Sequence, residues 1–199
     1  EACLALGRVR APRAGELLRL AATRESLTDV IRQHAFRGLA EARDDSALGV
    51  LVEGAKWGRI TQGRRAATSA LAMLVRGRRD REARDIRERV EQLLSDRDFR
   101  VQAAALEALG VIGDGAAIPS LRKMIDRELD GRLRRRGKEV IRDLEEGSSQ
   151  AEDVRRLRDE VGALRSLASG LRERLELIEA TEKAKREKIE KIRADLVSG

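Results

Sequence analysis

The feature that most constrains this sequence is a ten-residue pattern that recurs along its first three quarters. Its clearest copy is residues 101–110, and further copies lie at 31–40, 63–72 and 133–142, with a truncated one at 2–7. Each copy has a large aliphatic anchor: Leu6, Leu39, Leu71, Leu109 and Ile141. The anchors are 33, 32, 38 and 32 residues apart, a period typical of stacked helical repeats. Small residues and leucines recur at helical spacing, which predicts one apolar helix face per copy.

A second helix is predicted after each first helix. The Gly-Asp-Gly break at 113–115 precedes an apolar stripe formed by Ile118, Leu121 and Ile125. Pro119 suits the first turn of such a helix, where its missing N–H costs nothing. We therefore predict that residues 1–146 are all-α and form a solenoid of two-helix repeats of the HEAT type. Because one repeat alone cannot bury its apolar face, neighbouring repeats must stack.

Two features are predicted between the helices. Asp29, Asp98 and Asp130 each stand just before a first helix, where a carboxylate can cap free N–H groups. Residues 76–84 lengthen the third repeat. We expect this stretch to be a solvated loop, with a binding role as the alternative.

The composition excludes several kinds of chemistry. The single Cys3 rules out an intramolecular disulfide and a cysteine-based metal site, and the single His34 rules out a site that needs two histidines. No glycine-rich phosphate loop follows a strand pattern. We therefore predict no catalytic residue, no metal ligand and no cofactor in this chain. Trp57, one of three aromatic residues, is expected to fill a gap at a turn between repeats.

Charge and hydropathy bound the partners and the compartment. The 42 basic and 35 acidic residues give a net charge of +7, which permits an acidic partner or a nucleic acid without requiring either. No apolar run approaches the roughly 20 residues that span a bilayer, so no membrane segment is expected. One free thiol and no visible secretion signal favour the cytoplasm. Residues 1–7 resemble the end of a helix without an initiating Met, so we expect a fragment of a longer protein.

The pattern changes after a short polar linker at residues 147–150. From 151 to 199 the apolar residues follow heptads, which predicts a long coiled-coil helix. The apolar seam consists of Val154, Leu157, Val161, Leu164, Ala168, Leu171, Leu175, Ile178, Ile189, Ile192 and Leu196. Glu182 and Lys185 interrupt it. A parallel homodimer is favoured because Glu160 of one copy would face Arg165 of the other. The alternatives are docking on another protein and packing back on the solenoid.

The densest basic run is a candidate patch for an anionic partner. It comprises Arg132, Arg134, Arg135, Arg136 and Lys138. The alternative is a solvated face with ion pairs to Asp126, Glu128 or Asp130. No aromatic residue lies within the run, which argues against a surface for stacked bases.

Several stretches of the repeats together resemble a known family. They are ESLTDVIR at 25–32, GLA at 38–40, DDSAL at 44–48, RAA at 65–67, LLSDRDFRV at 93–101, IPSL at 118–121 and DGR at 130–132. In these, residues 1–146 resemble the C-terminal HEAT-repeat region of bacterial aminopeptidase N-type zinc metallopeptidases. The resemblance implies an upstream domain with HExxH and zinc, and a helical region that shapes access of peptides to it. None of the zinc ligands is present in this chain, and the coiled coil departs from the family's usual form.

Three functions therefore remain open from the sequence. The first is the non-catalytic C-terminal region of a zinc aminopeptidase-like protein, with a dimerising tail. The second is an adaptor that stands alone and binds a protein or peptide on the concave face of the solenoid. The third, a basic DNA-binding groove, is disfavoured because only Trp57 is available as an aromatic for it.

Overall fold

The structure is a computed structural model that describes the backbone of residues 2–9, 11 and 13–197. Side chains are described over the same residues except 151–152, 177–182, 184 and 186–197. The chain divides into two compact units, Glu1–Ser149 and Gln150–Gly199, and each is described by itself. Within the described residues, all regular elements are helices.

The first unit consists of helix pairs, as the repeat predicts. The first helices of the pairs are α1 (Ala2–Val9), α3 (Val30–Ala42), α5 (Thr61–Val75) and α7 (Phe99–Ile112). The second helices are α2 (Ala14–Thr23), α4 (Leu48–Ala55), α6 (Arg81–Leu93) and α8 (Ile118–Arg127). Short 3₁₀ turns at Leu27–Asp29, Asp45–Ala47 and Gly115–Ala117 lead into α3, α4 and α8. Helix α9 (Gly131–Val197) supplies the final half repeat with its first turns.

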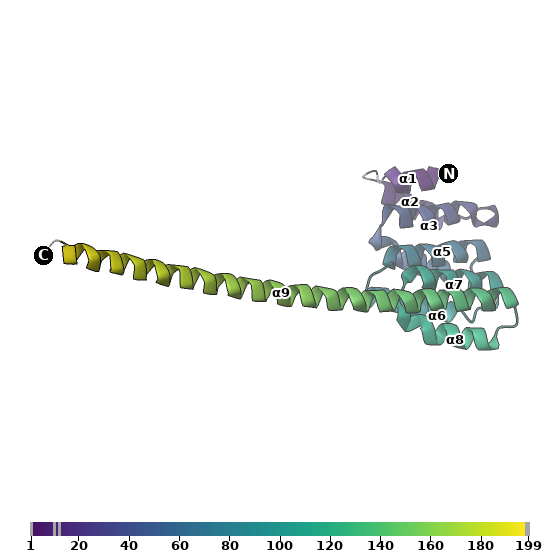
Figure 1. The fold of residues 1–199 in the computed structure, drawn as a ribbon. Coiled ribbons are helices and arrows are strands. Elements are labelled where there is room, and N and C mark those ends of the chain that lie inside the picture. Colours follow the sequence, from purple (N-terminus) through teal and green to yellow (C-terminus); the bar gives the residue numbers. More distant parts are fainter. Residues whose placement is uncertain (1, 10, 12, 198–199) are drawn as a thin grey trace. The chain divides into compact units, whose positions relative to one another are not determined.

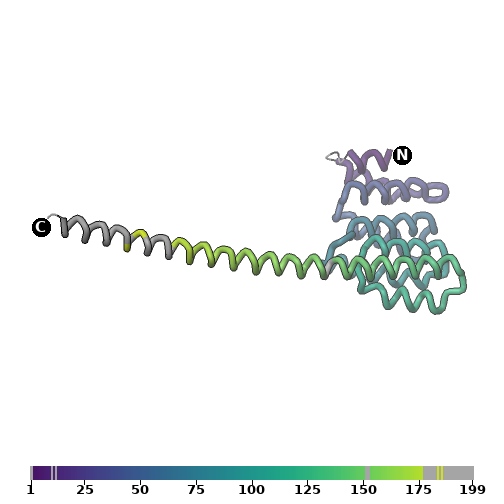
Figure 2. Tube along the Cα trace, viewed as in Figure 1, coloured from purple at the N-terminus to yellow at the C-terminus, as the bar shows by residue number. Residues whose placement is uncertain are grey.

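The helices form two layers. The first helices stack in chain order, α1 on α3, α3 on α5 and α5 on α7 (Figure 1, Figure 2). Each of α2, α4 and α6 packs against the first helix of the following repeat. This arrangement confirms a helical solenoid built from two-helix repeats.

The repeat anchors form the core between the layers. Leu39, Leu71 and Leu109 are fully buried, Ile141 is buried at the start of α9, and Leu6 packs against the same cluster. Each fully buried leucine stabilises the fold by roughly 1.5–3 kcal/mol relative to an exposed one. The hydrophobic period therefore sets both the helix faces and their stacking.

The capping predictions are confirmed at two of three positions. Asp98 accepts a hydrogen bond from the backbone N–H of Arg100 at 2.9 Å, and Asp130 accepts one from that of Arg132 at 2.7 Å. Pro119 lies in the first turn of α8 as predicted. The carboxylates of Asp98 and Asp130 thereby each accept a hydrogen bond from a backbone N–H that has no partner within its helix.

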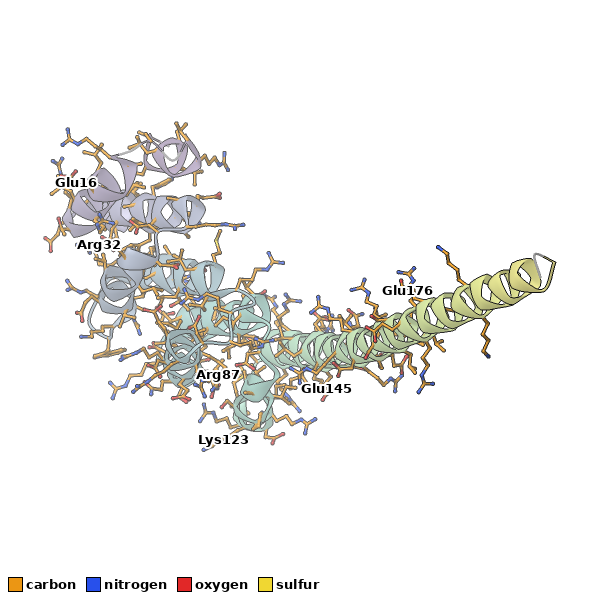
Figure 3. The ribbon with its side chains drawn as sticks, turned by 90° about the vertical axis from the view of Figure 1, so that its left-hand side faces the viewer. Glu16, Arg32, Arg87, Lys123, Glu145 and Glu176 are labelled. Atoms are coloured by element: carbon orange, nitrogen blue, oxygen red, sulfur yellow. The ribbon has the colours of Figure 1, made fainter. Side chains whose placement is uncertain are left out.

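Asp29 does not cap α3 with its side chain. Its backbone has φ of +64°, and its buried carboxylate accepts a hydrogen bond from Arg32 Nη1 at 2.9 Å. Arg32, labelled in Figure 3, also donates from Nε to the carbonyl of Ala22 at the end of α2, at 3.0 Å. A Cβ on Gly63 would collide with the Asp29 carboxylate, so α5 can pass this pair only with glycine there.

The same kind of contact recurs one repeat later. Arg64, like Arg32, stands seven residues before the anchor leucine of its repeat and is buried. Its Nε donates to the carbonyl of Ala55 at the end of α4, at 3.2 Å, and its guanidinium pairs with Asp96 between α6 and α7. One buried arginine thus connects α4, α5 and the α6–α7 connection.

The long third connection is shorter than predicted, and its backbone and side chains make hydrogen bonds to the end of α7. Helix α6 begins at Arg81, so the loop covers residues 76–80 rather than 76–84. Gly77 N–H donates to the carbonyl of Ile112 at 3.3 Å, and Arg79 donates to that of Gly113 at 2.9 Å. The loop therefore binds the free carbonyl end of α7 instead of being only solvated.

The predicted linker at residues 147–150 is helical. Helix α9 continues through Gly147, Ser148 and Ser149 without a break. Ser148 Oγ donates to the carbonyl of Leu144 at 2.9 Å, a bond within the helix. Glycine and serine cost a helix only about 0.5–1 kcal/mol each relative to alanine, and long flanking helical sequence outweighs this. The boundary between the two compact units nevertheless falls at 149/150.

Candidate functional site

A groove runs across the outer surface of the first helices. It has a volume of about 500 Å³ and is lined by residues of α1, α3, α5 and α7. The lining residues are Leu4, Arg8, Gln33, Arg37, Glu41, Gln62, Arg65, Ala66, Ser69, Ala70, Met73, Ala103, Ala104 and Glu107. We call it the first-helix groove.

The repeat explains the shape of this groove. Ala66 and Ala70 of α5, and Ala103 and Ala104 of α7, are small residues in its wall. Because alanine has only a Cβ, it leaves room for a ligand between the longer side chains on either side. Met73, which is 45% exposed, adds a flexible apolar surface. The result is a groove with a mostly apolar surface that also contains polar and charged side chains.

The groove is basic. Arg8, Arg37 and Arg65 are exposed, and in the part of the chain that the structure describes none of the three makes an ion pair. By contrast, Glu107 is held by Arg136 of α9 through bonds of 2.6 and 2.7 Å. The hydrogen bond from Arg136 keeps the pKa of Glu107 below its ordinary value, so Glu107 is ionised. The positive charge of Arg136 balances the charge of this carboxylate. Glu41 also lines the groove, so three arginines stand against one further carboxylate, and the remaining positive charge favours an acidic ligand.

The predicted basic patch is mostly exposed. Arg132, Arg134, Arg135 and Lys138 are exposed on the first turns of α9. Arg136 is partly buried and also pairs with Glu139 at 3.1 Å. The ion pairs therefore reach α7 and α9 itself, not the acidic residues at 126, 128 and 130 that the sequence suggested. The patch as a binding site stays a prediction.

Trp57 does not fill a gap between repeats, so that prediction is wrong. It follows α4 and is 66% exposed. Gly58, with φ of +87°, turns the chain directly after it. The guanidinium carbons of Arg64 and Arg97 lie over the ring, 5.6 and 5.5 Å from its centroid.

The two other single residues are structural. His34 Nδ1 lies 2.9 Å from the carbonyl of Val30 in its own helix. Cys3 is partly buried against the core. Across the described side chains, no cluster of three or more His, Cys, Asp or Glu has a geometry that could hold a metal ion.

The tail unit presents part of its predicted seam as exposed side chains. Val154, Leu157, Val161, Leu164, Leu171 and Leu175 are each 45–65% exposed, and Ala168 is also exposed. The side chains of Ile178, Ile189, Ile192 and Leu196 lie outside the described residues. Among the described residues, no helix is long and apolar enough to cross a membrane.

Sequence reasoning missed the groove and the buried arginines. A signal for the arginines was present: Arg32 and Arg64 occupy the same position of consecutive repeats. A charged residue that recurs at the same position of the repeat, on a helix packed between its neighbours, suggests a buried ion pair or hydrogen bond between repeats. The groove arginines Arg8, Arg37 and Arg65 occupy three different repeat positions, so no periodic signal marked them.

Comparison with known proteins agrees with this solenoid. A family model of HEAT repeats matches residues 61–142, from α5 to the first turns of α9. A similar solved chain comes from the complex of CpcE and CpcF of phycocyanin lyase from Nostoc sp. PCC7120, with 23% sequence identity and a TM-score of 0.55. The match covers 72% of this chain and 57% of that chain, so the present chain spans little more than half of that neighbour's length. Comparison with curated proteins finds no match. The chain thus contains HEAT repeats in an all-helical fold.

Proposed function

We propose that this chain is a non-catalytic HEAT-repeat module that binds a segment of another protein along the first-helix groove. The observation that carries the proposal is the groove itself, to which four successive first helices contribute. Helical solenoids commonly use such extended surfaces to bind proteins. The similar solved chain comes from a complex of two proteins, which is in keeping with this role.

The chemistry of the groove favours an acidic segment. Arg8, Arg37 and Arg65 come from three consecutive first helices, so they lie in succession across the stack. A segment lying across α1, α3 and α5 would present carboxylates to them in turn. The alanines of α5 and α7 would allow its backbone to approach closely.

Selection from a phage-displayed library of random 16-residue peptides tests this function. We expect enriched peptides to carry several carboxylates and to bind the double variant R37E/R65E at least tenfold more weakly than the natural chain, measured by calorimetry. The matched control is R81E/R84E, which reverses two exposed arginines on α6, outside the groove. Equal binding by R37E/R65E, or no enrichment at all, would rule the proposal out.

We also propose that the tail mediates self-association as a parallel coiled coil. The exposed apolar seam from Val154 to Leu175 supports this, since a helix with such a stripe gains by covering it. Two copies of the module would then bind a partner with higher avidity.

The resemblance to aminopeptidase N-type enzymes remains a prediction. The comparisons supply no link to that family, and any zinc would belong to a domain upstream of Glu1. An HExxH motif in the reading frame that precedes this chain would support it. The cytoplasm remains the expected compartment.

A further inference from the structure

A second surface lies at the edge of the solenoid, where the α4–α5 and α6–α7 connections meet. Trp57 and Ile60 project from the first connection, and Phe99 from the start of α7. They are 66, 47 and 59% exposed. Large aromatic groups in water mark surfaces that bind partners, and tryptophan and arginine dominate the binding energy of such surfaces.

Trp57 forms part of the wall of two cavities. One, of about 200 Å³, is bordered by apolar residues of α4, α5 and α6, including Val52, Leu71, Val90 and Leu93. The other, of about 520 Å³, has Trp57, Arg59, Arg97 and Phe99 in its wall, so it combines aromatic rings with guanidinium groups. The first cavity has room for one apolar side chain of a bound segment. The second has room for residues next to that side chain in the same segment.

The acidic side chains of this surface are already engaged. Asp96 pairs with the buried Arg64, and Asp98 accepts hydrogen bonds from Thr61 Oγ1 at 2.6 Å and from the N–H that it caps. Glu53 pairs with Lys56. The carboxylates of this surface therefore already have partners within the protein.

The exposed arginines of the same surface are not engaged in this way. Within the described part of the chain, Arg59, Arg97 and Arg100 make no ion pair. Arg97 lies over Trp57, and Arg100 lies over the Phe99 ring at 5.6 Å. A guanidinium stacked on a ring has a restricted orientation, so its N–H edge can meet a carboxylate at a lower entropic cost.

We propose that this surface, which we call the Trp57 site (Trp57, Arg59, Arg64, Arg97 and Phe99), binds an acidic segment of a partner protein. One apolar side chain of the segment enters the cavity beside Trp57. Carboxylates on either side of it pair with Arg59 and Arg97. The site is separate from the first-helix groove, and the two share none of the residues that line them.

A peptide fits these observations better than a single-stranded nucleic acid does. Base stacking needs open access to an aromatic ring face. Two guanidinium groups already lie over the Trp57 ring, and Arg100 lies over Phe99. The cavity beside Trp57, in contrast, suits an aliphatic or aromatic side chain because most of its wall is apolar, although Lys56 and Arg89 also line it.

The test uses Trp57 as its own probe, because it is the single tryptophan of the chain. A phage-displayed library of random 12-residue peptides is selected on the full chain after depletion on the double variant R59Q/R97Q. We expect enriched peptides to combine carboxylates with one large apolar residue and to shift the emission of Trp57 on binding. R59Q/R97Q should weaken binding at least tenfold, as should replacement of the apolar residue of the peptide by alanine.

Controls separate this site from the groove and from folding effects. R37E/R65E should change the affinity for these peptides by less than twofold. The test of the Trp57 site therefore does not depend on whether the groove proposal is correct. Far-UV circular dichroism and thermal unfolding check that R59Q/R97Q is folded. The variant R97K, which keeps the charge but loses the planar guanidinium, should lose less peptide affinity than R59Q/R97Q does.

Three results would overturn the proposal. They are enriched peptides without carboxylates, enriched peptides that leave Trp57 emission unchanged, and tighter binding of a 12-residue oligothymidine than of any selected peptide. The last result would assign the surface to single-stranded nucleic acid instead.

Discussion

Replacing Arg64 by methionine should destabilise the solenoid far more than any exposed substitution. The guanidinium pairs with Asp96, whose side chain is 6% exposed, donates to the carbonyl of Ala55 at 3.2 Å and lies over Trp57. Methionine keeps much of the apolar stem but none of the donors. Arg64→Met therefore leaves a carboxylate and a carbonyl without the partner that satisfied them.

The expected cost follows from that uncompensated charge. Breaking a buried ion pair by removing one partner typically costs about 3–5 kcal/mol, whereas domains of this size are stable by about 5–15 kcal/mol. The double variant R64M/D96N removes the stranded charge, and we expect it to recover at least about 1 kcal/mol. The matched control is Arg65→Met, next along α5 and exposed, with an expected effect within about 0.5 kcal/mol.

Lowering the pH should weaken the ion pair between Arg64 and Asp96. Burial alone would raise the pKa of Asp96, but hydrogen bonds from Arg64 and from the Asp98 N–H outweigh it and hold the pKa below its ordinary value of 3.8. A carboxyl group with a lowered pKa stabilises the fold above its unfolded pKa, and this contribution is lost as pH falls through the folded value. The natural chain should therefore lose more stability below about pH 4 than R64M/D96N does.

Urea unfolding followed by circular dichroism measures these differences at pH 7 and across the acid range. Since Arg64 ties α4, α5 and the α6–α7 connection, its loss should also lower the m-value as neighbouring repeats become less coupled. A cost below about 1 kcal/mol for Arg64→Met, or one equal to that of Arg65→Met, would refute the reasoning.

Three further predictions concern other contacts. Gly38→Ala should loosen α1, because a Cβ there would overlap the backbone of Cys3; faster amide exchange confined to α1 is the expected readout, and uniform exchange would contradict it. Asp98→Ala should cost about 1–2 kcal/mol through loss of the α7 cap, read from the urea midpoint, and an unchanged midpoint would count against it. The double variant L164D/L171D should convert a dimer to a monomer in sedimentation, whereas Ser166→Asp, placed off the seam, should not; a natural chain that is already monomeric would exclude the coiled coil.

The sequence was informative wherever local pattern and burial coincide. The anchor spacing predicted the first helices, because a leucine that recurs every 32–38 residues on an Ala-rich helix must face the same core. The caps at Asp98 and Asp130 were predictable because capping depends only on a carboxylate next to free N–H groups. These interactions span few residues, so the chain order alone specifies them.

Two of the failures have one physical cause, since they depended on residues distant in the chain. Trp57 was expected inside the protein, but it is 66% exposed, and two arginines from other elements lie over its ring. Asp29 was expected to cap, but Arg32 and the end of α2 hold it buried instead. The linker at 147–150 was expected to break the helix, but weak local preferences did not interrupt α9.

The sequence by itself thus determined the repeat, the helices and their apolar faces, because hydrophobic periodicity acts over a few residues. Only the tertiary structure decided which arginines are buried ties and which are exposed for a ligand. Arg64 and Arg65 are adjacent and chemically identical, yet one is enclosed with Asp96 and the other lines the first-helix groove. Helix rotation against the neighbouring repeats makes that difference, since it fixes which side chain meets a partner and which meets water.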